Sequence, residues 1–205
     1  MKRILTLIVF CYMFVLGLAA QNDAQVKQKI NEAASALATM QCDFVQTKHL
    51  KMLNDDIVSK GKIYYRKSDK LRCEYTSPTS YIFVMNGDKA LLKNKNRNRV
   101  IDVKQNKRLR GIVSIMMGNV VGNSLSDEKN FQTVIATTPT EWIATMQPIR
   151  KDIRRMFQRI ILHFSKQKAM VTAIELIEKN GDKTHIEFKN IRANEAISEN
   201  LFAVP

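Results

Sequence analysis

The amino-acid sequence predicts an α+β protein in which a curved antiparallel sheet packs against a few helices. Most of the chain consists of short runs rich in aromatic and β-branched residues, separated by Gly, Pro and Asn-Gly turn signals. Such runs are typical of consecutive antiparallel strands. Two other segments place apolar residues three or four positions apart, which is the spacing of one helix face. No linker, low-complexity segment or repeat divides the chain, so we expect a single domain.

The predicted strands fall into two groups along the chain. In the first group, Asn86-Gly87 is a strong hairpin signal and Pro78 marks another turn. In the second group, Pro139 and Asn180-Gly181-Asp182 separate neighbouring strands. The predicted strands are residues 42–50, 57–66, 71–76, 81–85, 89–93 and 99–103, followed by 131–137, 141–147, 154–165, 169–178 and 183–190.

Two helices are predicted on either side of the first group of strands. The first covers Asp23 to Met40, and the second covers Gln105 to Val121. The helical spacing is carried by Val26, Ile30, Ala33, Ala34, Leu37 and Met40 in the first, and by Leu109, Ile112, Val113, Ile115, Met116, Met117 and Val120 in the second. Gly122 follows the second helix, where glycine commonly ends a helix. The methionines of the second helix are either core residues or part of an adaptable apolar surface.

The first twenty residues have the pattern of a signal peptide. Lys2 and Arg3 precede an apolar stretch from Ile4 to Leu18, and small residues lead to Ala20. We therefore expect a signal peptide over residues 1–20, cleaved near Ala20, and one exported domain over residues 21–205. The alternative is a membrane anchor, but the apolar stretch is shorter than the roughly 20 residues of a spanning helix.

Two cysteines remain after this cleavage, Cys42 and Cys73. A disulfide is permitted in an exported protein. Both cysteines lie on predicted strands, with another strand between them, so a simple meander would separate them by about 10 Å. That distance is too long for a disulfide. We expect two buried free thiols, and a disulfide is the alternative.

The chain is strongly basic, with a formal net charge of +14. The excess is clustered: residues 89–110 contain nine Lys or Arg and one acid, and residues 150–168 contain seven and one. Such runs attract anionic surfaces. Because the protein is expected outside the cytoplasm, we expect an anionic lipid surface and no nucleic acid as a partner. The alternative is a solvated basic face without a partner.

The sequence contains no recognisable catalytic constellation. Gly-x-Ser-x-Gly, His-Glu-x-x-His and glycine-rich phosphate loops are absent. The histidines are His49, His163 and His185, and none stands beside a second ligand or a nucleophile. His163 and His185 are expected on strands that could be neighbours and could face each other, but two histidines alone rarely hold a metal. We expect no catalytic residues, no metal and no cofactor.

Several sequence elements occur in the order found in one known family. They are an amphipathic first helix, Phe44-x-Gln46, the strand that starts at Gly61, Arg72-x-Glu74-Tyr75, Asn86-Gly87-Asp88, a mid-chain apolar helix, and Trp142 before Pro148. In this order the sequence resembles the LolA-like family of periplasmic lipoprotein carriers, over residues 23–205.

The resemblance implies an unclosed antiparallel β-barrel of about eleven strands, with helices covering its concave face. In the family, acyl chains of lipoproteins lie between the helices and the sheet, and there is no catalysis. Carried over to this chain, the resemblance implies a hydrophobic cavity lined by Phe44, Ile63, Tyr65, Phe83, Met85, Ile112, Ile115 and Met116.

Two positions depart from the family pattern. Many relatives have Arg-Pro where this chain has Lys67-Ser68, and that Arg helps to hold the helical lid shut. Lysine lacks the rigid fork of arginine, so the latch is expected to be looser at Lys67 or to fall to Arg66. Relatives also often carry Trp where Cys73 stands, so the cavity wall is expected to be smaller there.

The resemblance implies a monomeric periplasmic carrier that shuttles lipid-modified proteins from the inner to the outer membrane. Its expected partners are the acyl chains of these proteins, an inner-membrane release complex and an outer-membrane acceptor. The alternatives are a lipid or glycolipid chaperone, or a lipid-sensing regulatory domain, on the same half-barrel. An exported enzyme is the third alternative.

Overall fold

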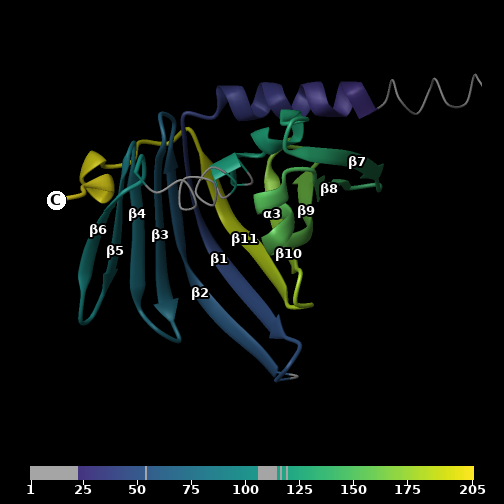
Figure 1. Ribbon diagram of the computed structural model, residues 1–205. Helices are drawn as coiled ribbons and strands as arrows, with labels where there is room; N and C mark the ends of the chain where they lie inside the picture. The colour runs from purple at the N-terminus through teal and green to yellow at the C-terminus, as the bar shows by residue number, and fades with distance from the viewer. Residues whose placement is uncertain (1–22, 54, 106–114, 116, 119) are drawn as a thin grey trace, which may run out of the picture.

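Eleven strands form one antiparallel sheet in the computed structural model, which describes residues 23–53, 55–105, 115, 117, 118 and 120–205 (Figure 1). Across the sheet, the strand order is β6-β5-β4-β3-β2-β1-β11-β10-β9-β8-β7. The strands are β1 (Thr39–Leu50), β2 (Asp55–Arg66), β3 (Lys70–Ser77), β4 (Tyr81–Asn86), β5 (Lys89–Asn94), β6 (Asn98–Asp102), β7 (Phe131–Thr137), β8 (Glu141–Pro148), β9 (Phe157–Ser165), β10 (Val171–Glu178) and β11 (Lys183–Ala193). Because β6 and β7 are the two edges and do not pair, the barrel is open, and the predicted unclosed α+β barrel is confirmed.

The strand order follows from two meanders joined along one seam. Within β1–β6 and within β7–β11, each strand pairs with the next strand in sequence, as short turns between antiparallel strands require. The seam is formed by β1 and β11, where Phe44 lies opposite Phe188. This long-range pairing places the two predicted groups of strands in one continuous sheet.

The alternation of side chains divides the sheet into a concave and a convex face. On β1, Met40, Cys42 and Phe44 are buried, and they belong to the large core on the concave face. A smaller, separate core on the convex face contains Val84 of β4 and Phe202 near the C-terminus. The concave face therefore holds most of the apolar interior, and an apolar ligand would bind on this side of the sheet.

The N-terminal helix (residues 23–36) lies across the end of the sheet at which β1 begins (Figure 1). Its buried residues Val26, Ile30 and Ala34 are four positions apart and face the concave core. The predicted extension of this helix to Met40 is wrong, because β1 starts at Thr39. Met40 satisfies both patterns: it is three residues after Leu37, and it also begins the alternation of β1.

The second predicted helix lies largely outside the described residues. Residues 115, 117, 118, 120 and 121 are helical, and Gly122 follows them with a φ of 87°. The Gly122 amide donates to the carbonyl of Gly118 at 2.8 Å, as expected for a left-handed residue that ends a helix. A Cβ atom at Gly122 would lie 2.7 Å from the ring of Phe164, so glycine also allows close packing here.

One further helix replaces part of a predicted strand. Residues Lys151–Met156 form α3, so the predicted strand over 154–165 is wrong in its first three residues. Ile153 is the buried residue of α3, and the backbone becomes extended at Phe157. The remaining helical pieces are the 3₁₀ turns η1 (Asn123–Ser126) and η2 (Glu199–Phe202). Among the described residues, no helix has the length and apolar character that crossing a membrane requires.

Candidate functional site

An apolar cavity of about 90 Å³ lies between the concave face and the helical residues that cover it. The covering side is formed by Ile115 and Val120, and Phe157, at the start of β9, also lines the cavity. The sheet side is formed by side chains from both meanders, on either side of the seam: Phe44, Gln46, Ile63, Cys73, Tyr75, Ile174, Leu176, Ile186 and Phe188. Every lining side chain except Gln46 is apolar, aromatic or a thiol, so the cavity suits a hydrocarbon ligand.

A row of aromatic rings crosses the concave face beside the cavity. Phe44 of β1 lies opposite Gly61 of β2, and a Cβ atom at Gly61 would lie 2.6 Å from that ring and 2.1 Å from the Glu74 carbonyl oxygen. The missing side chain lets Phe44 reach Tyr75 of β3, whose ring meets it edge to face with centroids 4.8 Å apart. Tyr75 in turn stacks on Tyr81 of β4, with centroids 4.2 Å apart.

Polar groups occur at one end of the cavity. The hydroxyl of Tyr75 donates to the Gln46 Oε1 atom at 3.1 Å. Burial raises the pKa of Tyr75, so the hydroxyl stays protonated. Two residues further along β1, Lys48 Nζ forms an ion pair with Glu178 Oε1 of β10 at 3.0 Å. The wall thus changes from apolar to polar to charged along β1.

A comparison of the sequence with models of known protein families gives a match over most of the chain. The model of the outer membrane lipoprotein carrier protein LolA family matches residues 35–205, which is most of the chain and includes all eleven strands. The chain belongs to the LolA family. Members of this family are carriers or binding proteins, and they are periplasmic or exported proteins related to lipoproteins.

Solved structures share the LolA fold at low sequence identity. A chain of the Pseudomonas aeruginosa MucA/MucB complex matches with a TM-score of 0.56 and 10% identity, covering 90% of this chain and 61% of that one. An uncharacterized conserved protein from Thermus thermophilus matches with a TM-score of 0.54 and 8% identity, covering 90% and 94%. The chain thus spans about three fifths of the matched chain in the MucA/MucB complex. No curated protein sequence is detectably similar.

The structure places the residues that the LolA resemblance implied in three groups. Phe44, Ile63 and Ile115 line the cavity. Tyr65, Phe83 and Met85 are buried in the same concave core but are not on the cavity wall. Ile112 and Met116 lie outside the described residues.

Most of the sheet wall was missed by sequence reasoning, including every wall residue on β10 and β11. Ile174 and Leu176 come from β10, and Ile186 and Phe188 come from β11. Each pair shows the two-residue spacing of one strand face, so the alternation was visible in the sequence. The alternation does not reveal that β11 pairs with β1, and only that pairing brings these side chains beside Phe44.

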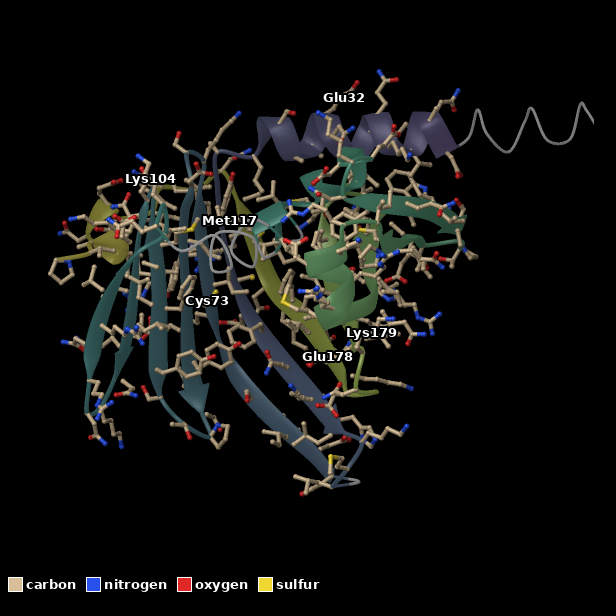
Figure 2. All side chains as sticks on the ribbon, viewed as in Figure 1. Glu32, Cys73, Lys104, Met117, Glu178 and Lys179 are labelled. Carbon is tan, nitrogen blue, oxygen red and sulfur yellow. The ribbon has the colours of Figure 1, made fainter. Side chains whose placement is uncertain are left out.

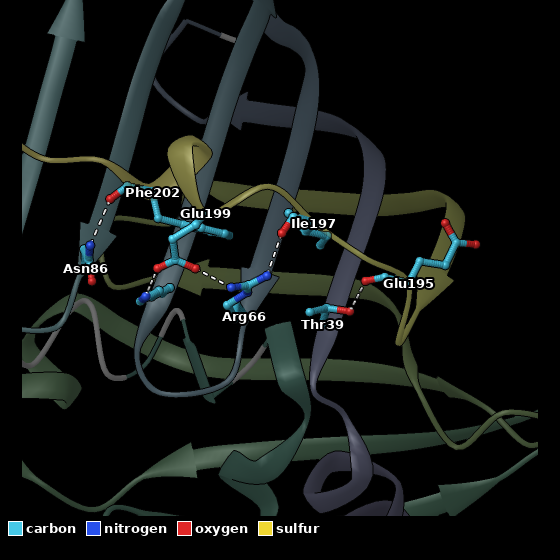
Figure 3. Close-up of polar contacts among 8 residues, drawn as sticks. Thr39, Arg66, Asn86, Glu195, Ile197, Glu199 and Phe202 are labelled. Atoms are coloured by element: carbon cyan, nitrogen blue, oxygen red, sulfur yellow. Dashed lines mark hydrogen bonds and ion pairs between the residues drawn. The ribbon is translucent and has the colours of Figure 1, made fainter.

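Lys67 and Arg66, the candidate latch residues, contact different parts of the protein. Lys67 Nζ donates to the Ser35 carbonyl at 2.7 Å, at the C-terminal end of the N-terminal helix. A cation there interacts favourably with the free carbonyls of the last helical turn. Arg66 instead forms an ion pair with Glu199 and donates to the Ile197 carbonyl, both in the C-terminal segment (Figure 3).

Both cysteines are buried free thiols, as expected from their strands. Cys42 and Cys73 lie on either side of Ile63 across three adjacent strands. Burial raises the pKa of each thiol to about 12, and for Cys42 the neighbouring Cys73 and Asp43 add to the shift. Neither thiol has the depressed pKa of a reactive cysteine.

The histidines do not come together. His163 is on β9 and His185 is on β11, with β10 between them, so the expectation that they face each other is wrong. His163 instead contacts Glu175 at 3.0 Å and Glu141 at 3.5 Å. Among the described residues, no three His, Cys, Asp or Glu side chains are grouped so that they could hold a metal ion.

Proposed function

We propose that this protein carries lipid-modified proteins from the inner to the outer membrane and holds their acyl chains against the concave face of its sheet. The observation that carries the proposal is the apolar cavity between the covering helical residues on one side and the sheet on the other. Membership of the LolA family supports the same role.

Burial of hydrocarbon provides the binding free energy. Each methylene transferred from water contributes about 0.8 kcal/mol. The cavity of about 90 Å³ is smaller than the roughly 300–1,000 Å³ of most ligand pockets. Binding of whole acyl chains therefore requires the covering residues Ile115 and Val120 to move away from the sheet.

Release requires the cavity to open again, and the weak contact at Lys67 suits such a movement. The hydrogen bond from Lys67 to Ser35 is solvent-exposed, and a single exposed bond of this kind contributes little net stability. The N-terminal helix, held to the sheet by apolar packing and this weak polar contact, can shift without loss of the sheet. An acceptor with a more apolar site would then take the cargo.

A second candidate function is a carrier or sensor of anionic lipid or glycolipid. The β5–β6 hairpin favours it, because its basic side chains are exposed on an edge of the sheet: Lys89, Lys93, Lys95, Arg97 and Arg99. Charged residues on an edge strand also prevent edge-to-edge aggregation. Protection of the edge accounts for the same charges without any lipid, so we rank lipoprotein transport first.

The test is extraction of lipoprotein from membranes. The mature protein is incubated with inner-membrane vesicles that contain a triacylated lipoprotein, and the soluble fraction is analysed by mass spectrometry for bound cargo. We expect a soluble complex with the wild-type protein. Ile115→Asp places a charge on the cavity wall and should reduce extraction at least tenfold, because an unpaired buried charge is costly.

Val134→Asp is the matched control, because Val134 is exposed on β7 and does not line the cavity. It should extract as much lipoprotein as the wild type. A wild-type protein that extracts no lipoprotein contradicts the proposal. Preferential extraction of anionic phospholipid in the same assay supports the second candidate instead.

A further inference from the structure

The acyl cavity is polar at one end only. Concave-facing residues along β1 run from Phe44 through Gln46 to Lys48, and β10 adds Glu178 beyond Leu176. Figure 2 shows Cys73 in the middle of the sheet and Glu178 nearer the β1–β2 hairpin. The N-terminal helix lies across the opposite end of the sheet (Figure 1). A ligand with a polar head and apolar tails therefore has a preferred orientation, with its head toward Lys48.

Gln46 has donors left for a ligand at this end. Its Oε1 atom already accepts from the Tyr75 hydroxyl at 3.1 Å. Its amide nitrogen donates to no residue that the structure describes. The ring of Tyr75 is held by Phe44 and Tyr81, so Gln46 is anchored by an ordered partner. The ligand group that fits here is a hydrogen-bond acceptor.

The acceptor is expected to be neutral. Lys48, the nearest cation along β1, is already paired with Glu178, and both side chains are about two-thirds buried. A phosphate or carboxylate at Gln46 would lie close to Glu178 and would have to displace it from Lys48. Ser59, which lies opposite Gln46 on β2, adds a second buried neutral polar group. The carbonyl of an ester-linked acyl chain is a neutral acceptor attached directly to a hydrocarbon tail.

We propose that Gln46, oriented by Tyr75, forms a subsite for the ester carbonyl of a glyceryl-linked acyl chain. This inference rests on the proposed acyl-binding function and adds the chemical class and orientation of the ligand. The tails enter the cavity toward Phe44 and Ile174, the ester group stops at Gln46, and the rest of the cargo leaves past Lys48 and Glu178.

The test compares an ester with an ether of the same chain length. Binding of 1,2-dioleoylglycerol and of its diether analogue is measured by displacement of a fluorescent fatty-acyl probe from the mature protein. The ether lacks the carbonyl acceptor and retains the hydrocarbon. We expect the wild type to bind the ester about three- to tenfold more tightly, which is the effect of one net hydrogen bond.

Gln46→Met keeps the side-chain length and removes the donors. It should abolish the ester preference, and a far-UV circular dichroism spectrum equal to that of the wild type shows that the variant is folded. Tyr75→Phe removes the hydroxyl that orients Gln46 and should reduce the preference. Gln132→Met, at an exposed position on β7, is the control and should keep the wild-type preference.

Two results overturn the subsite in different ways. If both proteins bind both lipids, and the ratio of ester affinity to ether affinity is the same in the wild type and in Gln46→Met, the subsite is excluded. The acyl-binding function is then unaffected. Failure of the wild type to bind either lipid removes the acyl-binding function and the subsite with it.

Discussion

At the scale of single residues, Gly61 and Cys73 decide the shape of the cavity wall. Gly61 leaves a gap in β2 through which Phe44 reaches Tyr75, so the aromatic row depends on the absence of a side chain. Cys73 lines the cavity with a small, neutral side chain. The wall beside Cys73 is therefore uncharged at neutral pH.

The thiols predict how stability depends on alkaline pH. Burial raises the pKa of Cys42 and Cys73 from about 9 to about 12. The unfolded chain therefore loses these protons near pH 9, whereas the folded protein keeps them until about pH 12. The contribution of both thiols to stability is complete below pH 9 and is lost as the pH rises toward 12.

The measurement is urea unfolding with reductant, comparing the wild type with the Cys42→Ala/Cys73→Ala variant. The wild type should lose stability relative to the variant from about pH 9 to pH 11. The variant is the control for tyrosines and lysines, which titrate in both proteins. A difference in the free energy of unfolding that stays constant from about pH 7 to 11 is inconsistent with buried protonated thiols.

At the scale of elements, the C-terminal segment that contains η2 stabilises the convex face of β3 and β4. Phe202 is fully buried against Val84 and Leu91. Polar contacts hold the same segment: Arg72 donates to the Leu201 carbonyl at 3.2 Å. Asn86 donates to the Phe202 carbonyl at 3.1 Å (Figure 3). This core is separate from the acyl cavity, so stability and binding can be changed independently.

Phe202→Ala should reduce the free energy of unfolding by about 3–5 kcal/mol, as expected for a fully buried Phe. Val204→Ala is the control, since Val204 is only half-buried beside the same core, and it should cost less than about 1 kcal/mol. Chemical denaturation of both variants checks this. Similar losses in the two variants would mean that Phe202 is not the anchor of the segment.

Strand existence and order within each meander were predictable because local alternation and turn residues specify them. The predicted strand over 131–137 coincides with β7, and Asn86-Gly87 forms the expected turn, with a φ of 58° at Gly87. Helix ends were less predictable. Met40 fits both a helical and a strand pattern, and α3 is a six-residue helix that continues directly into β9.

The cavity was predictable only in part. Phe44 and Ile63 follow from the resemblance, because they lie within the first meander where the matching elements are densest. Leu176 and Ile186 line the wall only because β1 pairs with β11, and this pairing joins segments about 140 residues apart in sequence. No local pattern specifies such a contact.

At the scale of the whole molecule, the cavity lies where the two meanders meet. One meander contributes Phe44 and Ile63, the other contributes Ile174 and Phe188, and the covering residues close the space. Solved structures with about one identical residue in ten share this architecture. We therefore expect acyl chains to lie on the concave face at this seam.

Photolabelling tests that claim most directly. A triacylated lipoprotein with a diazirine in one acyl chain is bound to the protein, irradiated, and the labelled residues are identified by mass spectrometry. The account predicts labels on concave residues such as Phe157, Leu176 and Ile186. Labels concentrated on the exposed convex residues Val58 and Val100, or on the exposed pair Met52 and Leu53 at the β1–β2 hairpin, would contradict it.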